Sequence, residues 1–595
     1  MKFWRVRVRN HIKALYKGEL IAKISRNILI KSKLIESFNN LPKNTDFRFF
    51  FMSKNLNPTN LKTYPHDLTY YEYMNEKINL YDYSFCNNSK SPKWFYLVPP
   101  KETDVKIIWE INRLQFLPLM AVDFLKTKDT KILIRIKDII KEWDSKNPYD
   151  IGINWYSNLE VAIRSISLLL TYILLYTHIK SKEIEELIFK HGYHIYKDIN
   201  YTEKCIPNNH LIGEATALYI LGNIFESPES KKWIDKSKAI LIDYLEHLRD
   251  DGTYKEGSLS YHRFVLQMYL LVYLFSIKFK DNFIEKPLKD KFVKAYIFLK
   301  SIEKSDGSFP QFGDWDDGVY YKLNYEPIEN YKYFVDTLGY IVDQNNKKNV
   351  EIEILEELFE NIKIEENHKN VFNDFTNVFR VFEIGKYGIY KNSNIYLFIN
   401  NQEQIFHSHA DGLSIELSLN GKNILTDSGT YNYNLDKELR QYFRSTKAHN
   451  TIYLGLDQST QIGRFRWVDQ PKTYLKKLED KIGFEGTIKY KNKSMHKRRV
   501  IVENNLITVE DEVNSQKNYI ELNFHFSPER RIQLITKDKI EIDGEIKLQI
   551  TSDKEFDTKI EDSYYSPTYN KIQKRKNLKI ISKNENQKFL TKIQF

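Results

Sequence analysis

Hydrophobic residues recur every three or four positions through most of the first 370 residues, which is the spacing of helices with one apolar face. Many consecutive helices without a repeat of fixed period indicate an α/α toroid or a helical solenoid. Pro118 should kink or divide the first of them. Short loops with Gly, Pro or Asn separate the expected helices, which lie at residues 104–125, 131–143, 158–176, 210–225, 232–248, 261–279, 290–302 and 351–364.

The pattern changes near residue 370, after a polar stretch at 365–374. From Val378 onward, apolar and polar residues alternate with the period of half-buried strands, and Asn420-Gly421 offers a tight hairpin turn. Many short strands separated by turn residues predict an antiparallel β-sandwich. We therefore expect a multidomain fold, α then β, with a helical or irregular extension at 1–100, an α/α toroid at 101–370 and an antiparallel β-sandwich at 371–595.

Length and composition agree with a large globular protein. The 595 residues are too many for one ordinary core, and 42% of them are hydrophobic, which excludes a disordered chain. The net charge of +11 suits a polyanionic partner, although it equally suits simple solubility. Cys86 and Cys205 are the only cysteines, which excludes a disulfide scaffold and an all-cysteine metal site. No basic stripe with interleaved aromatic residues supports nucleic-acid binding.

No segment has the roughly 18 consecutive apolar residues of a membrane span. The nearest candidate, residues 163–179, is interrupted by Arg164 and His178 and is typical of a buried helix. The basic N-terminus lacks the uninterrupted apolar core and cleavage site of a signal peptide. We therefore expect a cytoplasmic protein by default, with a periplasmic or envelope-associated location as the alternative.

The clearest candidate for chemistry is the hairpin at 406–432 and the segment that follows it. His407 and His409 precede its first strand, and Asp427 follows the start of its second strand, so the hairpin can bring these residues together. His449 lies further along. Imidazoles and a carboxylate that converge suit a zinc-sized cation. The plain alternative is a hairpin with solvated histidines.

Two further clusters precede predicted helices. Asn209 and His210 directly precede or begin an apolar helix, where Asn commonly serves as an N-cap and where the helix dipole favours an anion. A glycine-rich loop at 251–258 leads into the helix that carries Tyr261. This tyrosine would face either the core or a cleft.

A loop at 307–318 carries Asp314, Asp316 and Asp317 beside Trp315, which we expect to be exposed. It could be an Asx-turn loop, the rim of a sugar-binding cleft, or a carboxylate pair for hydrolysis. Beyond the hairpin, the guanidinium groups of Arg440 and Arg444 would suit sulfate or carboxylate groups, and would equally suit internal ion pairs.

Together these motifs resemble the heparinase II/III-type polysaccharide lyases, which include the oligoalginate lyases. The resemblance extends from about residue 104 to the C-terminus, and it implies an incomplete α/α toroid followed by an antiparallel β-sandwich. It rests on Asn208-Asn209-His210, Tyr261-His262, Trp109-Glu110 with Arg113, 154–160 with Arg164, Gly313-Asp314, HSHADGLSIELSLNGKNILTDSGTY at 407–431 and RSTKAHNT at 444–451.

The resemblance implies β-elimination on a uronate. Asn209 would hydrogen-bond the substrate carboxylate, and His407 would share that task. Tyr261 would transfer a proton at the sugar bond, as the acid and, for one C5 configuration, also as the base. Its reference pKa near 10 would have to be lowered or matched by nearby cations. His210 is the second candidate base.

The resemblance also implies a structural divalent metal, most simply Zn²⁺, held by His409, Asp427 and His449. The partner would be an acidic polysaccharide, with no nucleic acid, and a homodimer is one option for the oligomeric state. Such lyases also occur beside capsule and O-antigen synthesis systems, where the substrate is the cell's own polymer. We expect further substrate contacts from four side chains, those of Trp155, Glu256, Trp315 and Arg444.

Two other functions compete with this interpretation. A glycoside hydrolase on the same scaffold would need two carboxyl groups astride the bond, from Asp314, Asp316 or Glu256. A non-catalytic protein that binds acidic glycans would tolerate the loss of Tyr261. The fold alone does not identify the polymer.

Overall fold

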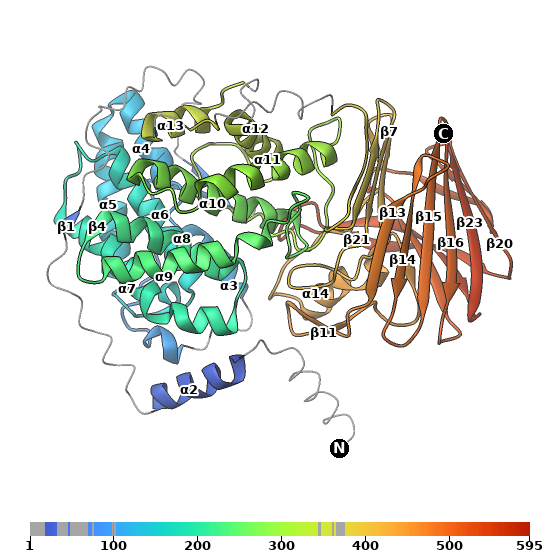
Figure 1. The fold of residues 1–595 in the computed structure, drawn as a ribbon, viewed down its shortest axis with the longest axis horizontal. Coiled ribbons are helices and arrows are strands. Elements are labelled where there is room, and N and C mark those ends of the chain that lie inside the picture. The colour runs from blue at the N-terminus through green and yellow to red at the C-terminus, as the bar shows by residue number, and fades with distance from the viewer. Residues whose placement is uncertain are drawn as a thin grey trace.

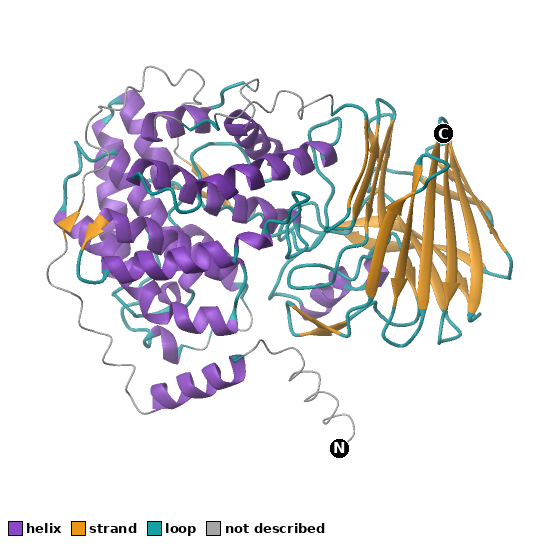
Figure 2. Ribbon diagram, in the orientation of Figure 1, coloured by secondary structure: helices purple, strands orange, loops and turns teal. Residues whose placement is uncertain are grey.

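The computed structural model describes residues 18–31, 46–47, 70–73, 76–97, 99, 103–342, 347–359, 362–364 and 375–595. Most of the expected extension at 1–100, and the polar boundary at 365–374, lie outside these residues. Figures 1 and 2 show a helical region followed by a region of strands, and the two pack side by side. The predicted fold class, α then β, is confirmed.

The helical region is assembled from amphipathic and fully apolar helices around one core. The last of its described helices ends at Phe359. These helices are α2 (Glu19–Lys31), α3 (Val105–Asn112), α4 (Leu117–Thr127), α5 (Thr130–Lys146), α6 (Asn158–Leu174), α7 (Lys182–Cys205), α8 (Asn209–Ile224), α9 (Ser230–Asp243), α10 (Leu259–Phe279), α11 (Glu285–Ile302), α12 (Tyr331–Val342) and α13 (Val350–Phe359).

Local sequence explains several of the helix boundaries. The helix expected at 104–125 is divided into α3 and α4, and Pro118 lies in the first turn of α4, where its missing N–H is tolerated. Asn208 caps α8, and its side-chain oxygen accepts a hydrogen bond from the His210 amide. Helix α7 has no counterpart among the predicted helices, because charged residues interrupt its apolar spacing. No helix within the described ranges is both long and apolar enough to cross a bilayer.

The strands of the C-terminal region form three larger antiparallel sheets. The first contains, in order, β5 (Val378–Phe382), β6 (Tyr387–Lys391), β7 (Ile395–Asn400), β8 (Ser414–Leu419) and β9 (Lys422–Leu425). The second contains β13 (Lys472–Lys477), β14 (Gly483–Lys489), β15 (Met495–Glu503), β16 (Leu506–Asn514), β23 (Asn586–Gln594), β20 (Ile546–Ser552), β19 (Lys539–Ile542) and β18 (Ile532–Thr536).

The third sheet and several short elements complete the chain. The third sheet contains β10 (Ile452–Tyr453), β17 (Ile520–His525), β22 (Gln573–Ser582) and β21 (Asp557–Tyr565). The short helix α14 (Lys437–Arg444) lies in this half of the chain. Three two-stranded ribbons pair β11 (Thr460–Ile462) with β12 (Arg466–Val468), β1 (Asp46–Phe47) with β4 (Phe225–Glu226), and β2 (Tyr70–Tyr73) with β3 (Glu76–Asn79).

Strand β7 joins the helical region to the sandwich. All of its residues are buried, so it is apolar along most of its length instead of alternating. Leu397 and Ile399 belong to the core of the sandwich, whereas Tyr396 and Phe398 belong to the core of the helical region. The first sheet is therefore covered on both faces, and this fixes the two halves of the molecule against each other.

The predicted hairpin is present between β8 and β9. Asn420 and Gly421 both have positive φ, at 50° and 76°, as a tight two-residue turn requires. At the other end of β8, Leu413 also has a positive φ of 60°, which is a strained conformation for a branched side chain. Arg498 donates to the Leu413 carbonyl at 2.7 Å and to the Asn450 carbonyl at 2.6 Å. Asp511 accepts two further hydrogen bonds from the same guanidinium.

We predict that Arg498→Ala lowers the free energy of unfolding by about 3–5 kcal/mol, because it leaves the Asp511 carboxylate buried without its cation. The neighbouring Arg499 is 35% exposed and pairs with Glu510, so Arg499→Ala should cost less than about 1 kcal/mol. Denaturant unfolding of both variants measures the difference. Equal losses would contradict the role given to Arg498.

Candidate active site

Asn209 stands at the first position of α8, wholly buried. Its backbone N–H donates to Glu256 Oε1 and its side-chain Nδ2 donates to Glu256 Oε2, both at 2.7 Å. The same Nδ2 lies 3.4 Å from His407 Nε2. Glu256 therefore fixes the orientation of the Asn209 amide, and the second N–H of Nδ2 points toward His407.

Tyr261 lies in the first turn of α10, after the N-cap residue Ser258. Its ring stacks on that of His407, with 3.6 Å between ring centroids and an interplanar angle of 11°. Its hydroxyl donates to Asp316 Oδ2 at 3.0 Å and lies 3.2 Å from the Tyr433 hydroxyl. The structure thus brings Asn209, Tyr261 and His407 into one cluster, where the two halves of the chain meet.

Asp314 connects this cluster to the histidine hairpin. His407 Nδ1 lies 2.9 Å from its Oδ2, and His409 Nε2 lies 3.1 Å from its Oδ1. Arg440 donates to both carboxylate oxygens, and the Asp314 amide donates to the His407 carbonyl at 2.7 Å. Burial by itself would raise the pKa of Asp314, but Arg440 and the two imidazoles hold that pKa well below its usual range.

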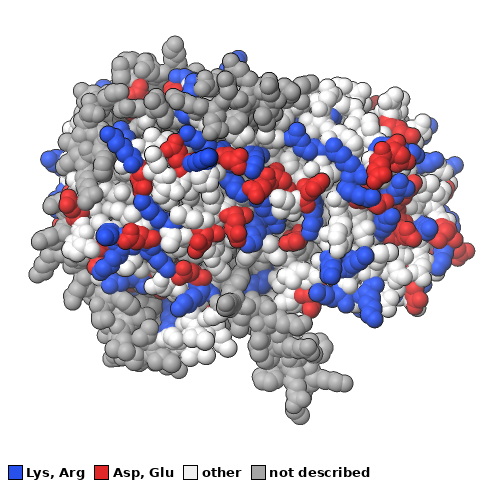
Figure 3. All heavy atoms as spheres, viewed as in Figure 1, with Lys and Arg blue, Asp and Glu red and all other residues white. Residues whose placement is uncertain are grey.

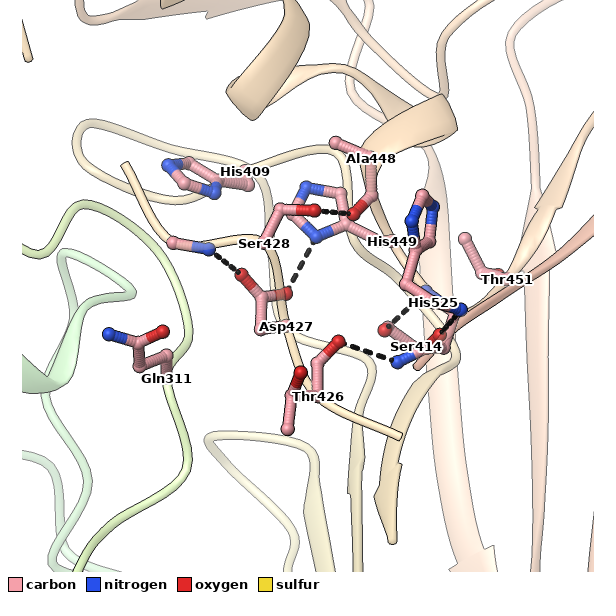
Figure 4. Close-up of polar contacts among 12 residues, drawn as sticks. Gln311, His409, Ser414, Thr426, Asp427, Ser428, Ala448, His449, Thr451 and His525 are labelled. Carbon is pink, nitrogen blue, oxygen red and sulfur yellow. Dashed lines mark hydrogen bonds and ion pairs between the residues drawn. The ribbon is translucent and has the colours of Figure 1, made fainter. Parts of the chain in front are cut away.

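The three expected metal ligands also converge. His409, Asp427 and His449 are buried, and one potential ligand atom from each lies within 4.8 Å of the others. His449 Nδ1 contacts Asp427 Oδ2 at 2.7 Å, as Figure 4 shows. Among the described residues, His409 Nδ1 and His449 Nε2 have no hydrogen-bond partner. Two buried imidazole nitrogens and a carboxylate are a donor set that fits Zn²⁺.

The surroundings shift the pKa values of the two candidate proton carriers, Tyr261 and His210, in opposite directions. Burial raises the pKa of the Tyr261 hydroxyl well above its ordinary value, and Asp316 and Asp314 raise it further. This is opposite to the lowering expected from nearby cations. Burial lowers the pKa of His210 to about 4, despite the opposing effect of Glu160. Near neutral pH, the phenol is therefore protonated and the His210 imidazole is neutral.

The four residues expected to contact the substrate are all buried. Trp155 packs in the helical core against His191, with ring centroids 4.8 Å apart and no exposed surface. Arg444 is equally buried, with its guanidinium 4.3 Å from the centre of the Trp467 ring. Both side chains are as fully buried as Asn209, and their expected substrate contacts stay predictions. Tryptophan and arginine serve in cores as well as at binding surfaces.

The other two expected contacts are close to the cluster but are also enclosed. Trp315 is only 6% exposed and packs on Tyr331, with 4.5 Å between ring centroids, so its expected exposure is wrong. Glu256 is fully buried and holds Asn209 and Tyr254. Glu256 therefore contacts Asn209, which is the residue expected to bind the substrate carboxylate.

Two residues near the cluster were not identified from the sequence. Tyr433 lies beside Tyr261, and the Phe465 ring lies 5.3 Å from that of His407. Tyr433 lies close in sequence to Asp427, and its nearness to a predicted metal ligand could have identified it. Phe465 lies between β11 and β12, where nothing in the sequence distinguishes it from the many other aromatic residues of the chain.

Solved structures of two lyases share this fold. A crystal structure titled heparinase III superposes with a TM-score of 0.62 at 16% identity, over 98% of this chain and 92% of that one. A crystal structure of a heparan sulfate lyase from Pedobacter heparinus superposes with a TM-score of 0.55 at 17% identity, over 98% and 92% of the two chains. At these identities the likeness establishes the fold alone.

Sequence comparison identifies curated relatives with higher identity over shorter stretches. A heparin-sulfate lyase of Pedobacter heparinus is 23% identical over 394 residues, which cover 62% of this chain and 55% of the relative. A heparin-sulfate lyase of Bacteroides stercoris is 28% identical over 194 residues, 31% of this chain and 28% of the relative. The chain thus spans about half, or less, of the curated relatives that it matches.

Family models cover both halves of the molecule. The model described as heparinase II/III N-terminus matches residues 29–337, and the model described as heparinase II/III-like, C-terminal, matches residues 377–595. Together they include most of the helical region, the sandwich and every residue of the cluster. The chain therefore belongs to the heparinase II/III family.

Proposed function

We propose that this protein is a polysaccharide lyase that cleaves a uronic-acid-containing glycan by β-elimination. The observation that carries the proposal is the convergence of Asn209, Tyr261 and His407 at one point. An amide, an imidazole and a phenol are the groups that such an elimination requires. The heparin-sulfate lyases among the relatives support the same reaction class.

Each group has a defined task in the elimination. The C5 proton of the uronate leaves to a base, the electron pair forms the C4–C5 double bond, and the bond from C4 to the glycosidic oxygen breaks. The Asn209 amide, beside His407 Nε2, would stabilise the negative charge that develops on the uronate carboxylate. The protonated Tyr261 hydroxyl would donate its proton to the departing oxygen. The neutral His210 imidazole is the candidate base.

The hydrolase alternative has weaker support. Arg440 and the imidazoles of His407 and His409 engage Asp314, while Tyr261 and Ser260 engage Asp316. Despite burial, the pKa of each of these two carboxyl groups lies below its ordinary value, because cations and hydrogen bonds favour the charged form. A glycosidase acid needs the opposite shift.

His409, Asp427 and His449 would hold the metal, which we propose to be Zn²⁺. A bound zinc ion would supply charge that fixes the hairpin, and we assign it no step in the elimination. Since Asp314 binds His409 on its other nitrogen, the metal would also stabilise the loop that carries His407. Its part in catalysis would therefore be structural.

Three kinds of acidic polymer are candidate substrates. Heparan sulfate is the first candidate, because the curated relatives are heparin-sulfate lyases. Alginate and the cell's own capsule or O-antigen polysaccharide are the others. Incubation of the protein with each polymer, followed by ultraviolet absorbance of the unsaturated uronate, tests the proposal directly. A saturated product, formed by addition of water, would contradict it.

We predict that Tyr261→Phe lowers kcat by about 10²–10⁴-fold, because the substitution removes the proton donor and retains the ring that stacks on His407. Formation of the unsaturated product measures the loss. The matched control is Tyr219→Phe, which removes a hydroxyl bonded to Asp281 in the helical region and should leave kcat unchanged. Full activity of Tyr261→Phe would reject the assignment of Tyr261.

We predict that the purified protein contains about one zinc ion per chain, and that His449→Ala loses it. Mass spectrometry of the metal content measures this, and chelation should lower Tm until zinc is restored. His496→Ala is the control, because His496 is a buried histidine that pairs with Asp511 away from the three ligands. Metal retained by His449→Ala, or lost equally from His496→Ala, would argue against the site.

A further inference from the structure

Helix α2 is held on the folded body by its polar side chains. Glu19 is wholly buried and pairs with Arg466 of β12, at 2.7 and 2.9 Å. Arg26 donates to Asp198 of α7 at 3.1 Å, and its guanidinium lies 3.8 Å from the centre of the Tyr201 ring. Figure 1 shows α2 outside the other helices, beside the junction of the two halves.

Over residues 20–24, the outward side of α2 is apolar. Leu20 is 54% exposed, Ile21 is 72% exposed and Ile24 is 50% exposed. This arrangement reverses the usual one, in which a surface helix buries its apolar face and exposes its polar face. Three large aliphatic side chains within two turns form a contiguous surface that another apolar phase would cover.

The charge of the surrounding sequence indicates which apolar phase covers this aliphatic surface. Residues 1–31 contain nine lysines and arginines and one acidic residue, Glu19, whereas the whole chain has a net charge of +11. Elsewhere, basic and acidic side chains intermingle over the face drawn in Figure 3. A basic segment with an exposed aliphatic helix face is the combination that binds an anionic bilayer surface.

We propose that α2 docks the protein on an anionic lipid membrane, with Leu20, Ile21 and Ile24 inserted at the headgroup boundary and the net positive charge of residues 1–31 attracting the anionic surface. The helix lies flat on the surface and does not span the bilayer. This site is separate from the proposed catalytic cluster and does not depend on its activity.

Docking through α2 would place the proposed catalytic cluster near the membrane. Arg466, which holds Glu19, follows Phe465 directly, and the Phe465 ring lies 5.3 Å from that of His407. The hairpin of β11 and β12 thus runs from the membrane-facing helix to the wall of the cluster. A polymer anchored at the same surface would be close to the residues that act on it.

The test is flotation of the whole protein with vesicles of phosphatidylglycerol and phosphatidylcholine, compared with vesicles of phosphatidylcholine alone. We expect the protein to float only with the anionic vesicles, and the bound fraction to fall as salt is added. Replacing Ile21 and Ile24 by serine should weaken partitioning about tenfold or more, because it removes most of the inserted aliphatic surface.

The control variant is Ile134→Ser, since Ile134 is 57% exposed on α5 and should not touch the membrane. Equal binding to both vesicle types, or equal losses in the control and α2 variants, would overturn the proposal. A dimer that the Ile21→Ser/Ile24→Ser variant converts to a monomer in sedimentation would instead assign the surface to a second copy. A soluble acidic polysaccharide that competes with the vesicles and binds equally well to the serine variant would instead show that the basic residues bind glycan. Either result would overturn lipid docking.

Discussion

The buried carboxylate of Asp314 is the contact on which the rest of the site depends. It can only accept hydrogen bonds, so the nitrogens that face it, His407 Nδ1 and His409 Nε2, must carry protons. One carboxylate therefore fixes both rings. It leaves His407 Nε2 facing Asn209, and it leaves His409 Nδ1 free to ligate a metal. Arg440 compensates the charge of Asp314, which lowers the free-energy cost of burying this carboxylate.

The same carboxylate ties the two halves of the chain together. Asp314 comes from the loop after α11, whereas its partners His407, His409 and Arg440 belong to the C-terminal half. Other contacts reinforce this junction at a distance from Asp314. Lys304 donates to Glu416 at 2.9 Å. The shared packing of β7 provides the apolar part of the interface, and the polar contacts set its register.

Much of the fold could be predicted from periodicity, since the change from helical to alternating spacing marks the order of the two regions. The hairpin turn at Asn420-Gly421 and the division at Pro118 follow from backbone chemistry that is local to those residues. Helix α7 could not be predicted in this way, because its stability comes from partners that the sequence does not show. The central position of Asp314 is hidden for the same reason, since its partners are distant along the chain. The burial of Trp155 and Arg444 could not be predicted either, because residue type alone does not distinguish a core from a cleft.

The burial of the cluster sets a condition on how it can act. Asn209 has no exposed surface, Tyr261 is 7% exposed and His407 is 4% exposed. Such enclosure removes water, and this lets the environment raise the pKa of Tyr261 while it lowers that of His210, so that a neutral acid and a neutral base coexist. The proposed elimination requires a polysaccharide to reach these groups, of which Tyr261 and His407 keep a small exposed surface. Phe465, between β11 and β12, packs on His407 and therefore forms part of the wall that a substrate would meet.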